Sequence, residues 1–193
     1  MVAESEPAIA ALRAGSCVGI PTDTVYGLAA RLDDAAAVES LFALKGRAAT
    51  KAMAVLVADV SSAGELGVLD DRARAMAERF WPGPLTLVVR RAAGVDVDLG
   101  GDPATIGVRC PALEVVRELA TAVGPIVTTS ANLSGEPTIE TAEEIAATFA
   151  GLACVLDGGR LQAAASTVVD LCGPGMMVLR EGPVSTAQLL ELS

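Results

Sequence analysis

Short apolar runs alternate with longer amphipathic segments along this chain, a pattern that predicts strands alternating with helices. The apolar runs expected to form strands are 17–21, 53–58, 85–90, 105–109, 125–129, 153–156, 166–171 and 176–180. Several of these runs follow one another with no helical segment between them. The sequence therefore predicts an α/β domain whose sheet is mixed rather than purely parallel.

Helix-start signals separate many of these runs. Asp33 and Asp34 precede an apolar helical pattern, Pro111 suits a first helical turn, and Thr141 with Glu144 forms a capping-box pattern. The helices expected from such signals cover 6–14, 35–44, 70–80, 111–122 and 141–149, with a last short one from Ser185. No change in composition marks a boundary, so we expect residues 1–193 to form a single domain.

The composition is that of a folded protein. Hydrophobic residues make up 52% of the 193 residues and charged residues 20%, which argues against disorder. No apolar stretch approaches 18 residues, so no membrane span is predicted. Residues 1–7 carry two glutamates and no basic residue, which is unlike a secretory signal. We expect a cytoplasmic protein whose four cysteines are reduced and mostly buried.

The absence of histidine narrows the chemistry most. Without histidine, the chain has no Ser-His-Asp or Cys-His nucleophile system and no imidazole metal ligand. The net charge of −10 disfavours nucleic acid as a partner. Against this background, Lys45, Arg47 and Lys51 gather in residues 41–58, a segment without a single acid. This segment is the best candidate for an anion-binding site.

Polar side chains also gather where predicted strands end. Arg109 and Arg180 each end a strand, and hydroxyl and amide residues follow two others: Thr22, Thr24, Thr128, Thr129, Ser130 and Asn132. Ligands of open α/β sheets bind beyond strand ends, so we expect these residues to converge. Such a set suits positioning and electrostatic stabilisation of a phosphate ester. Neither a Walker A sequence nor G-x-G-x-x-G is present, so a nucleotide would be held by another device.

Eight short motifs, spread over about residues 8–183, carry a resemblance to a known family. On these motifs the chain resembles the YrdC-like (TsaC) family of threonylcarbamoyl-AMP synthases. The motifs are P-T-D-T-V-Y-G-L at 21–28, K-G-R at 45–47, W-P-G-P-L-T at 81–86, T-I-G-V-R at 105–109, T-S-A-N-L-S-G at 129–135, D-G-G at 157–159, S-T-V-V-D at 166–170 and L-R-E-G at 179–182.

The resemblance implies a fold and an activity. The fold is a twisted, open mixed α/β sheet around a large concave cavity. The activity is that of a nucleotidyltransferase, which forms threonylcarbamoyl-AMP and pyrophosphate from L-threonine, bicarbonate and ATP with Mg2+. A separate transferase complex then uses the product to modify an adenosine beside the anticodon of certain tRNAs. We expect no tight binding to tRNA itself and none to membranes.

The resemblance also assigns residues. Its K-x-R and S-x-N signatures fall on Lys45 and Arg47, expected to be catalytic, and on Ser130 and Asn132. The expected ATP-binding set is Lys45, Arg47, Thr105, Ser130, Asn132 and Arg180, and the expected threonine-binding set is Thr22, Arg109, Thr129 and Ser166. In the second set, Arg109 offers a guanidinium fork for the amino-acid carboxylate. No protein ligand for a metal is assigned.

The chain departs from the family pattern at four positions. Ala48 and Ala52 stand where many members have proline, Met53 replaces a leucine, and Leu113 replaces a histidine expected near Arg109. These departures keep a second reading open, a divergent paralogue that binds nucleotide or RNA without this activity. A nucleic-acid-binding module and a carbamoyl-transfer enzyme acting on another acceptor are further alternatives.

Two residues within the motifs stay ambiguous from sequence alone. Tyr26 either lines the pocket or is a buried core tyrosine with a satisfied hydroxyl. Asp23 either caps a turn or assists Mg2+.

Overall fold

The structure is a computed structural model that describes residues 2–46, 51–133 and 135–192. In this part of the chain, eight strands form one sheet in the order β1-β2-β6-β3-β5-β4-β7-β8. Neighbouring strands are antiparallel except for β3 with β5 and β4 with β7, so the predicted mixed sheet is confirmed. The strands are β1 (Val18–Ile20), β2 (Gly27–Arg31), β3 (Ala54–Leu56), β4 (Leu85–Arg90), β5 (Thr105–Arg109), β6 (Ile126–Ser130), β7 (Thr167–Asp170) and β8 (Met177–Arg180).

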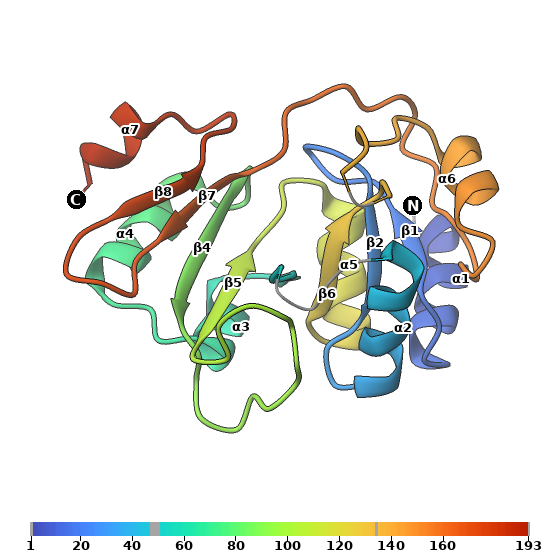
Figure 1. The fold of residues 1–193 in the computed structure, drawn as a ribbon, viewed down its shortest axis with the longest axis horizontal. Coiled ribbons are helices and arrows are strands. Elements are labelled where there is room, and N and C mark those ends of the chain that lie inside the picture. Colours follow the sequence, from blue (N-terminus) through green and yellow to red (C-terminus); the bar gives the residue numbers. More distant parts are fainter. Residues whose placement is uncertain (1, 47–50, 134, 193) are drawn as a thin grey trace.

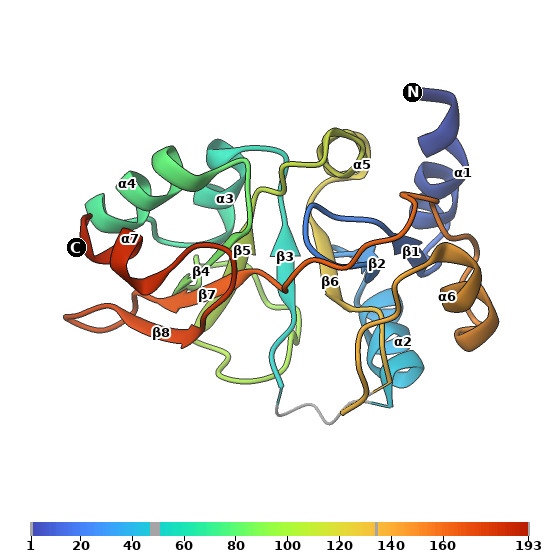
Figure 2. The same ribbon diagram turned by 90° about the horizontal axis from the view of Figure 1, so that it is seen from above.

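Helices cover the two faces of the sheet unequally. Figure 2 shows α3, α4 and α5 on one side and α2 and α6 on the other. On the second side, α2 and α6 lie beside the strands β1, β2 and β6. The rest of that face, over β5, β4 and β7, carries no helix among the described residues (Figure 1). The helices are α1 (Val2–Arg13), α2 (Ala35–Lys45), α3 (Val60–Leu66), α4 (Asp71–Phe80), α5 (Glu114–Val123), α6 (Ala142–Thr148) and α7 (Thr186–Leu190).

Two hydrophobic clusters follow from the alternation of side chains along the strands. On β2, Leu28 packs into the larger cluster with Leu41 of α2, whereas its neighbour Ala29 packs into the smaller one with Leu12 of α1 and Leu119 of α5. All five side chains are completely buried. The strand β2 therefore has hydrophobic clusters on both of its faces.

Most of the elements expected from the sequence are present. The helix predicted from residue 6 already begins at Val2, and the run at 153–156 is not a strand. That run is joined to β1 by a single bridge between Gly19 and Val155. The glycine pair that follows it, Gly158 and Gly159, explains why pairing does not extend further.

Two elements were not expected from the sequence. The strand β2 reads G-L-A-A-R, and its glycine and alanines have little intrinsic preference for strands. It forms because β1 and β6 pair with it on both edges and both of its faces are buried. The short helix α3 carries a glycine in its interior, but Asp59 caps its first turn by accepting from the Ser62 N–H.

Among residues 2–46, 51–133 and 135–192, no helix combines the length and the apolar character that crossing a membrane requires.

Candidate active site

A cavity of about 330 Å³ lies on the helix-free face of the sheet. It runs along β5 from Thr105 to Arg109, and alternate residues of the neighbouring strands line it because successive side chains point to opposite faces. Thr86 and Val88 of β4 face the cavity, whereas Leu87 between them is buried in the core. The segment that leads into β7 closes one side with Ala165 and Ser166, and β8 contributes Leu179 and Arg180.

Arg109 is held firmly at one end of the cavity. Its Nε donates to the Gly83 carbonyl at 3.0 Å, its Nη1 to the Thr24 hydroxyl at 2.9 Å, and its Nη2 to the Asp23 carboxylate at 2.7 Å. Burial lowers the pKa of Arg109, while the charge of Asp23 acts in the opposite direction. A guanidinium has five N–H donors, so two remain for a ligand.

Thr22 and Thr24 support Arg109 through a chain of hydroxyl groups. Thr22 donates its hydroxyl proton to the Val25 carbonyl at 2.6 Å, so the Thr24 hydroxyl must be the donor in the 2.9 Å contact between the two threonines. The oxygen of Thr24 is then free to accept from Arg109. Both threonines are buried, and both line the cavity.

Ser166 and Arg180 face Arg109 across the same end. Arg180 donates from Nε to the Ser166 carbonyl at 2.8 Å and from Nη2 to the Ser166 hydroxyl at 3.0 Å. Much of Arg180 is open to solvent, yet desolvation lowers the pKa of its guanidinium and the like charge of Arg109 lowers it further. The Thr86 hydroxyl, 2.9 Å from that of Ser166, completes this group.

Lys45 is brought to the S-x-N residues by the end of α2. The helix begins at the N-cap Asp34 and ends at Gly46, whose φ of 57° is the left-handed conformation that favours glycine. The buried Lys45 in the last turn donates from Nζ to Asn132 Oδ1 at 2.6 Å and to the Ser130 hydroxyl at 3.2 Å. It also donates to the Ser130 carbonyl, and Ser130 donates to Asn132 Oδ1 at 2.7 Å.

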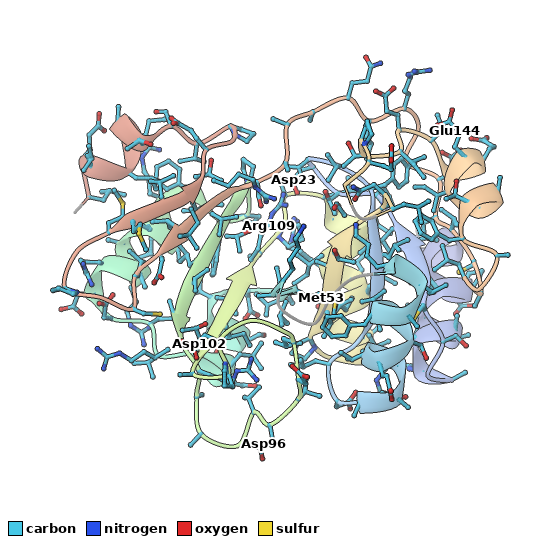
Figure 3. The ribbon with its side chains drawn as sticks, viewed as in Figure 1. Asp23, Met53, Asp96, Asp102, Arg109 and Glu144 are labelled. Atoms are coloured by element: carbon cyan, nitrogen blue, oxygen red, sulfur yellow. The ribbon has the colours of Figure 1, made fainter. Side chains whose placement is uncertain are left out.

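The other end of the cavity is formed by Thr105 and its surroundings. Thr105 donates its hydroxyl to the Asp102 carbonyl at 3.2 Å, and Thr129 is buried in the wall beside Ser130. Figure 3 shows the labelled Asp102 and Asp96 at this lower end, far from Arg109. Lys51 is exposed, and Arg47 and Ala48 lie outside the described residues.

Two lining residues, Thr86 and Arg91, were not expected from the sequence. Arg91 donates to the carbonyls of Thr105 and Val97 at 3.1 and 2.7 Å, so it ties the loop after β4 to the start of β5. The signals that could have found them are the alternation of Thr86 with Val88 and a second arginine at a strand end.

The structure shows the environment of the two ambiguous residues, Tyr26 and Asp23, and of Leu113, one of the departures from the family pattern. Tyr26 is a buried tyrosine whose hydroxyl donates to the Gly159 carbonyl and accepts from the Gly158 N–H, both at 2.8 Å, and the residue also lines the cavity. Asp23 pairs with Arg109. Leu113 packs in the smaller hydrophobic cluster near α5 and is not a lining residue, so the histidine it replaces marks a position outside the cavity wall.

The thiols are unsuited to nucleophilic chemistry. The four cysteines are free, with Cys17 and Cys110 buried and the other two half-buried. Burial raises the pKa of Cys17 and of Cys172 to about 11, and it also raises the pKa of Cys110 and Cys154. Each thiol is therefore protonated at neutral pH.

The charge of the cavity wall is positive although the protein is acidic. Arg91, Arg109 and Arg180 line it, and no aspartate or glutamate does so among the described residues. Nor do these residues contain a group of three or more Cys, Asp or Glu side chains that could hold a metal ion.

The fold and the cavity define a class of protein: an open mixed α/β sheet with a cationic, hydroxyl-rich cavity for a small anionic ligand. The Sua5/YciO/YrdC family model, described as "Telomere recombination", matches residues 10–182. The chain belongs to this family, which confirms the resemblance seen in the motifs.

Individual relatives extend the comparison. A Mycobacterium tuberculosis protein, assigned provisionally by its name as a threonylcarbamoyl-AMP synthase, is 41% identical over 188 residues, which are 96% of this chain and 87% of that protein. The threonylcarbamoyl-AMP synthase of Pyrococcus abyssi is 38% identical over 175 residues, covering 89% of this chain and 52% of that protein. The crystal structure of P. abyssi Sua5 complexed with L-threonine superimposes with a TM-score of 0.90 at 35% identity, covering 97% of this chain and 56% of that one.

Proposed function

We propose that this protein is a threonylcarbamoyl-AMP synthase, which converts L-threonine, bicarbonate and ATP to threonylcarbamoyl-AMP and pyrophosphate. The observation that supports this most directly is the convergence of distant side chains on one cavity. The Lys45 cluster with Ser130 and Asn132 adjoins the cavity wall, and Arg109, Ser166 and Arg180 lie at the end of the same cavity. The names of the relatives and the threonine complex of P. abyssi Sua5 agree with this proposal.

Threonine occupies the Arg109 end in this proposal. The two unused N–H donors of Arg109 bind the amino-acid carboxylate, and the Thr22, Thr129 and Ser166 hydroxyls surround the rest of the molecule. The amine then adds to carbon dioxide with loss of a proton, or to bicarbonate with loss of water, and becomes N-carboxy-threonine. The walls of the cavity shield this labile carbamate from water.

ATP extends from the other end toward the same point. Lys45, Ser130 and Asn132, together with Arg47 on sequence grounds, bind its phosphates, and Thr105 lies beside the nucleotide. Arg180 is placed at the junction because it contacts Ser166 of the threonine set. The carbamate oxygen attacks the α-phosphorus, the bond to pyrophosphate breaks, and the cations stabilise the charge that develops on the phosphates.

The wider setting of this function follows from the same proposal. Residues 1–193 act as one domain in the cytoplasm, Mg2+ enters bound to ATP, and a tRNA threonylcarbamoyl transferase complex receives the product. With a net charge of −10 and a cavity of about 330 Å³, the protein binds small anions rather than tRNA itself.

Pyrophosphate release tests the proposal. Purified protein with L-threonine, bicarbonate, Mg2+ and ATP should release pyrophosphate and form threonylcarbamoyl-AMP, detected by mass spectrometry. Omission of threonine should abolish both signals, because the carbamate is the nucleophile. Pyrophosphate release that is independent of threonine would contradict the proposal and favour a divergent paralogue.

A further inference from the structure

Among the residues that the structure describes, two cationic side chains line the Arg109 end of the cavity, and one carboxylate is paired with them from behind. Arg109 and Arg180 both line this end, and the charge of Arg109 is one of the causes that lower the pKa of Arg180. In the described part of the chain, Arg180 donates only to Ser166 and forms no ion pair. Among the described residues, Asp23 is therefore the one acid that forms an ion pair with either guanidinium, and its partner is Arg109.

Asp23 lies behind Arg109 rather than in the cavity wall. Its Oδ1 accepts from Arg109 Nη2 at 2.7 Å, and the two side chains are only 15% and 6% exposed. Figure 3 shows the two labelled side chains close together, between the halves of the molecule that carry β5 and β6. Because Asp23 does not line the cavity, it acts on a ligand through its charge and through Arg109.

The second oxygen of Asp23 indicates that the negative charge of this residue is important, and not only its hydrogen bond to Arg109. Oδ2 is buried and has no hydrogen-bond partner in the described residues. Keeping such an oxygen on a buried carboxylate is costly, and an uncharged acceptor could bind Nη2 as well. The feature that distinguishes the carboxylate from that acceptor is its negative charge.

The net charge at this end decides what kind of anion it binds best. Two guanidinium groups and one carboxylate leave a single positive charge, which matches an amino-acid carboxylate. Without Asp23 the same end would carry two positive charges and would favour a doubly charged phosphate group. ATP and pyrophosphate bring several such groups into the same cavity. Their phosphate groups therefore compete with the threonine carboxylate for the cationic side chains.

We propose that Asp23 is a specificity-determining residue that reserves the Arg109 guanidinium for a singly charged carboxylate and keeps phosphate groups from taking its place. This inference deepens the proposed function, since it rests on threonine binding at this end. Asp23 itself touches neither substrate, and its effect is transmitted by the charge balance around Arg109.

Asp23→Asn tests the inference, because the amide keeps an oxygen for Arg109 and removes the charge, while an NH2 group takes the place of Oδ2. Threonine binding is titrated calorimetrically with and without inorganic phosphate. In the wild type, phosphate should leave the Kd for threonine unchanged. In Asp23→Asn, phosphate should bind where threonine binds. It should therefore raise the apparent Kd for threonine by about tenfold.

Three further variants serve as controls. Asp33→Asn makes the same change in net charge at an exposed pair with Arg31 away from the cavity, and should behave as the wild type. Thr24→Val removes a hydrogen bond to Arg109 without changing the charge, so it should weaken threonine binding but not admit phosphate. Asp23→Glu keeps the charge and should still exclude phosphate, even where Asp23→Asn proves unstable.

The outcomes separate this inference from the proposed function. If Asp23→Asn loses threonine affinity while phosphate still does not compete, Asp23 only positions Arg109 and the inference is wrong. Competition by phosphate in the wild type would also overturn it. If the wild type binds no threonine, the proposed function fails, and direct phosphate titrations of the wild type and Asp23→Asn still test whether the charge of Asp23 excludes phosphate.

Discussion

Lys45 illustrates how one side chain depends on both local and distant structure. Gly46 ends α2 directly after it, and Ser130 and Asn132, more than eighty residues away in sequence, receive its ammonium protons. The ammonium is buried without entering the cavity wall, which is formed beside it by Ser130. Its positive charge is therefore fixed at one flank of the cavity before any ligand arrives.

Replacing Lys45 should affect catalysis more than folding. Lys45→Met keeps the apolar stem and removes the charge, so we expect kcat to fall by more than about tenfold, by analogy with the loss of one electrostatic contact to a transition state. The measurement is steady-state pyrophosphate release, with circular dichroism to verify the fold. Arg79→Met, which removes a charge at an exposed position in the last turn of α4, is the matched control. Unchanged kinetics in Lys45→Met would remove its role at the phosphates.

Among the helices and strands, those that could be predicted carry a signal in their own sequence, and those that could not depend on their neighbours. The strands β4 and β5 and the capped helices α2 and α6 could be predicted because runs of apolar residues and Asp34 or Thr141 caps are local features. The strand β2 could not, since only its neighbours make G-L-A-A-R a strand. Arg91 and Thr86 could not be predicted as lining residues, because the strand order that brings β4 beside β5 and β7 has no local sequence signal.

The junction after β8 depends on one buried hydroxyl. Thr167 of β7 accepts from the N–H groups of Gly182 and Val184, at 2.9 and 3.1 Å, and donates to the Val184 carbonyl at 2.6 Å. Gly182 has no room for a side chain there, because a Cβ would lie 2.2 Å from the Ala165 carbonyl oxygen. This junction fixes the segment that carries Ser166 against the end of β8.

Thr167→Val should therefore destabilise the protein markedly. The substitution keeps the shape of the side chain but leaves buried N–H groups without an acceptor, at a cost of about 2–4 kcal/mol in the free energy of unfolding. Urea denaturation measures this change. Thr121→Val, which removes an exposed hydroxyl on α5, is the control and should have little effect. A change below about 0.5 kcal/mol in Thr167→Val would show that the junction is held by other contacts.

For the whole molecule, carboxylates at helix starts link stability to pH. Backbone N–H groups of Ser62 and Ala73 donate to Asp59 and Asp70 and lower the pKa of both acids below the usual range. An acid whose pKa is lowered by folding stabilises the protein at pH values above its unfolded pKa of about 3.9. This contribution is lost as the pH falls through the pKa of the folded protein.

The resulting prediction concerns a double variant, Asp59→Asn with Asp70→Asn. At neutral pH the variant should be less stable than the wild type, because its neutral amides bind the N–H groups more weakly. The difference in unfolding free energy should shrink as the pH falls from about 5 to below the folded pKa values, where the wild-type acids are also uncharged. Urea denaturation across this range is the measurement, and a difference independent of pH would contradict the assignment.

The order of the sheet also matters while the polypeptide is being made. Translation delivers β4 and β5 well before the last two strands, yet Ser166 lies in the segment entering β7 and Arg180 lies in β8, and both complete one end of the cavity. A nascent chain interrupted before residue 167 leaves β4 as a bare edge with its apolar face partly uncovered. A chain that ends before residue 167 therefore lacks part of the cavity and leaves β4 open to pairing with other chains.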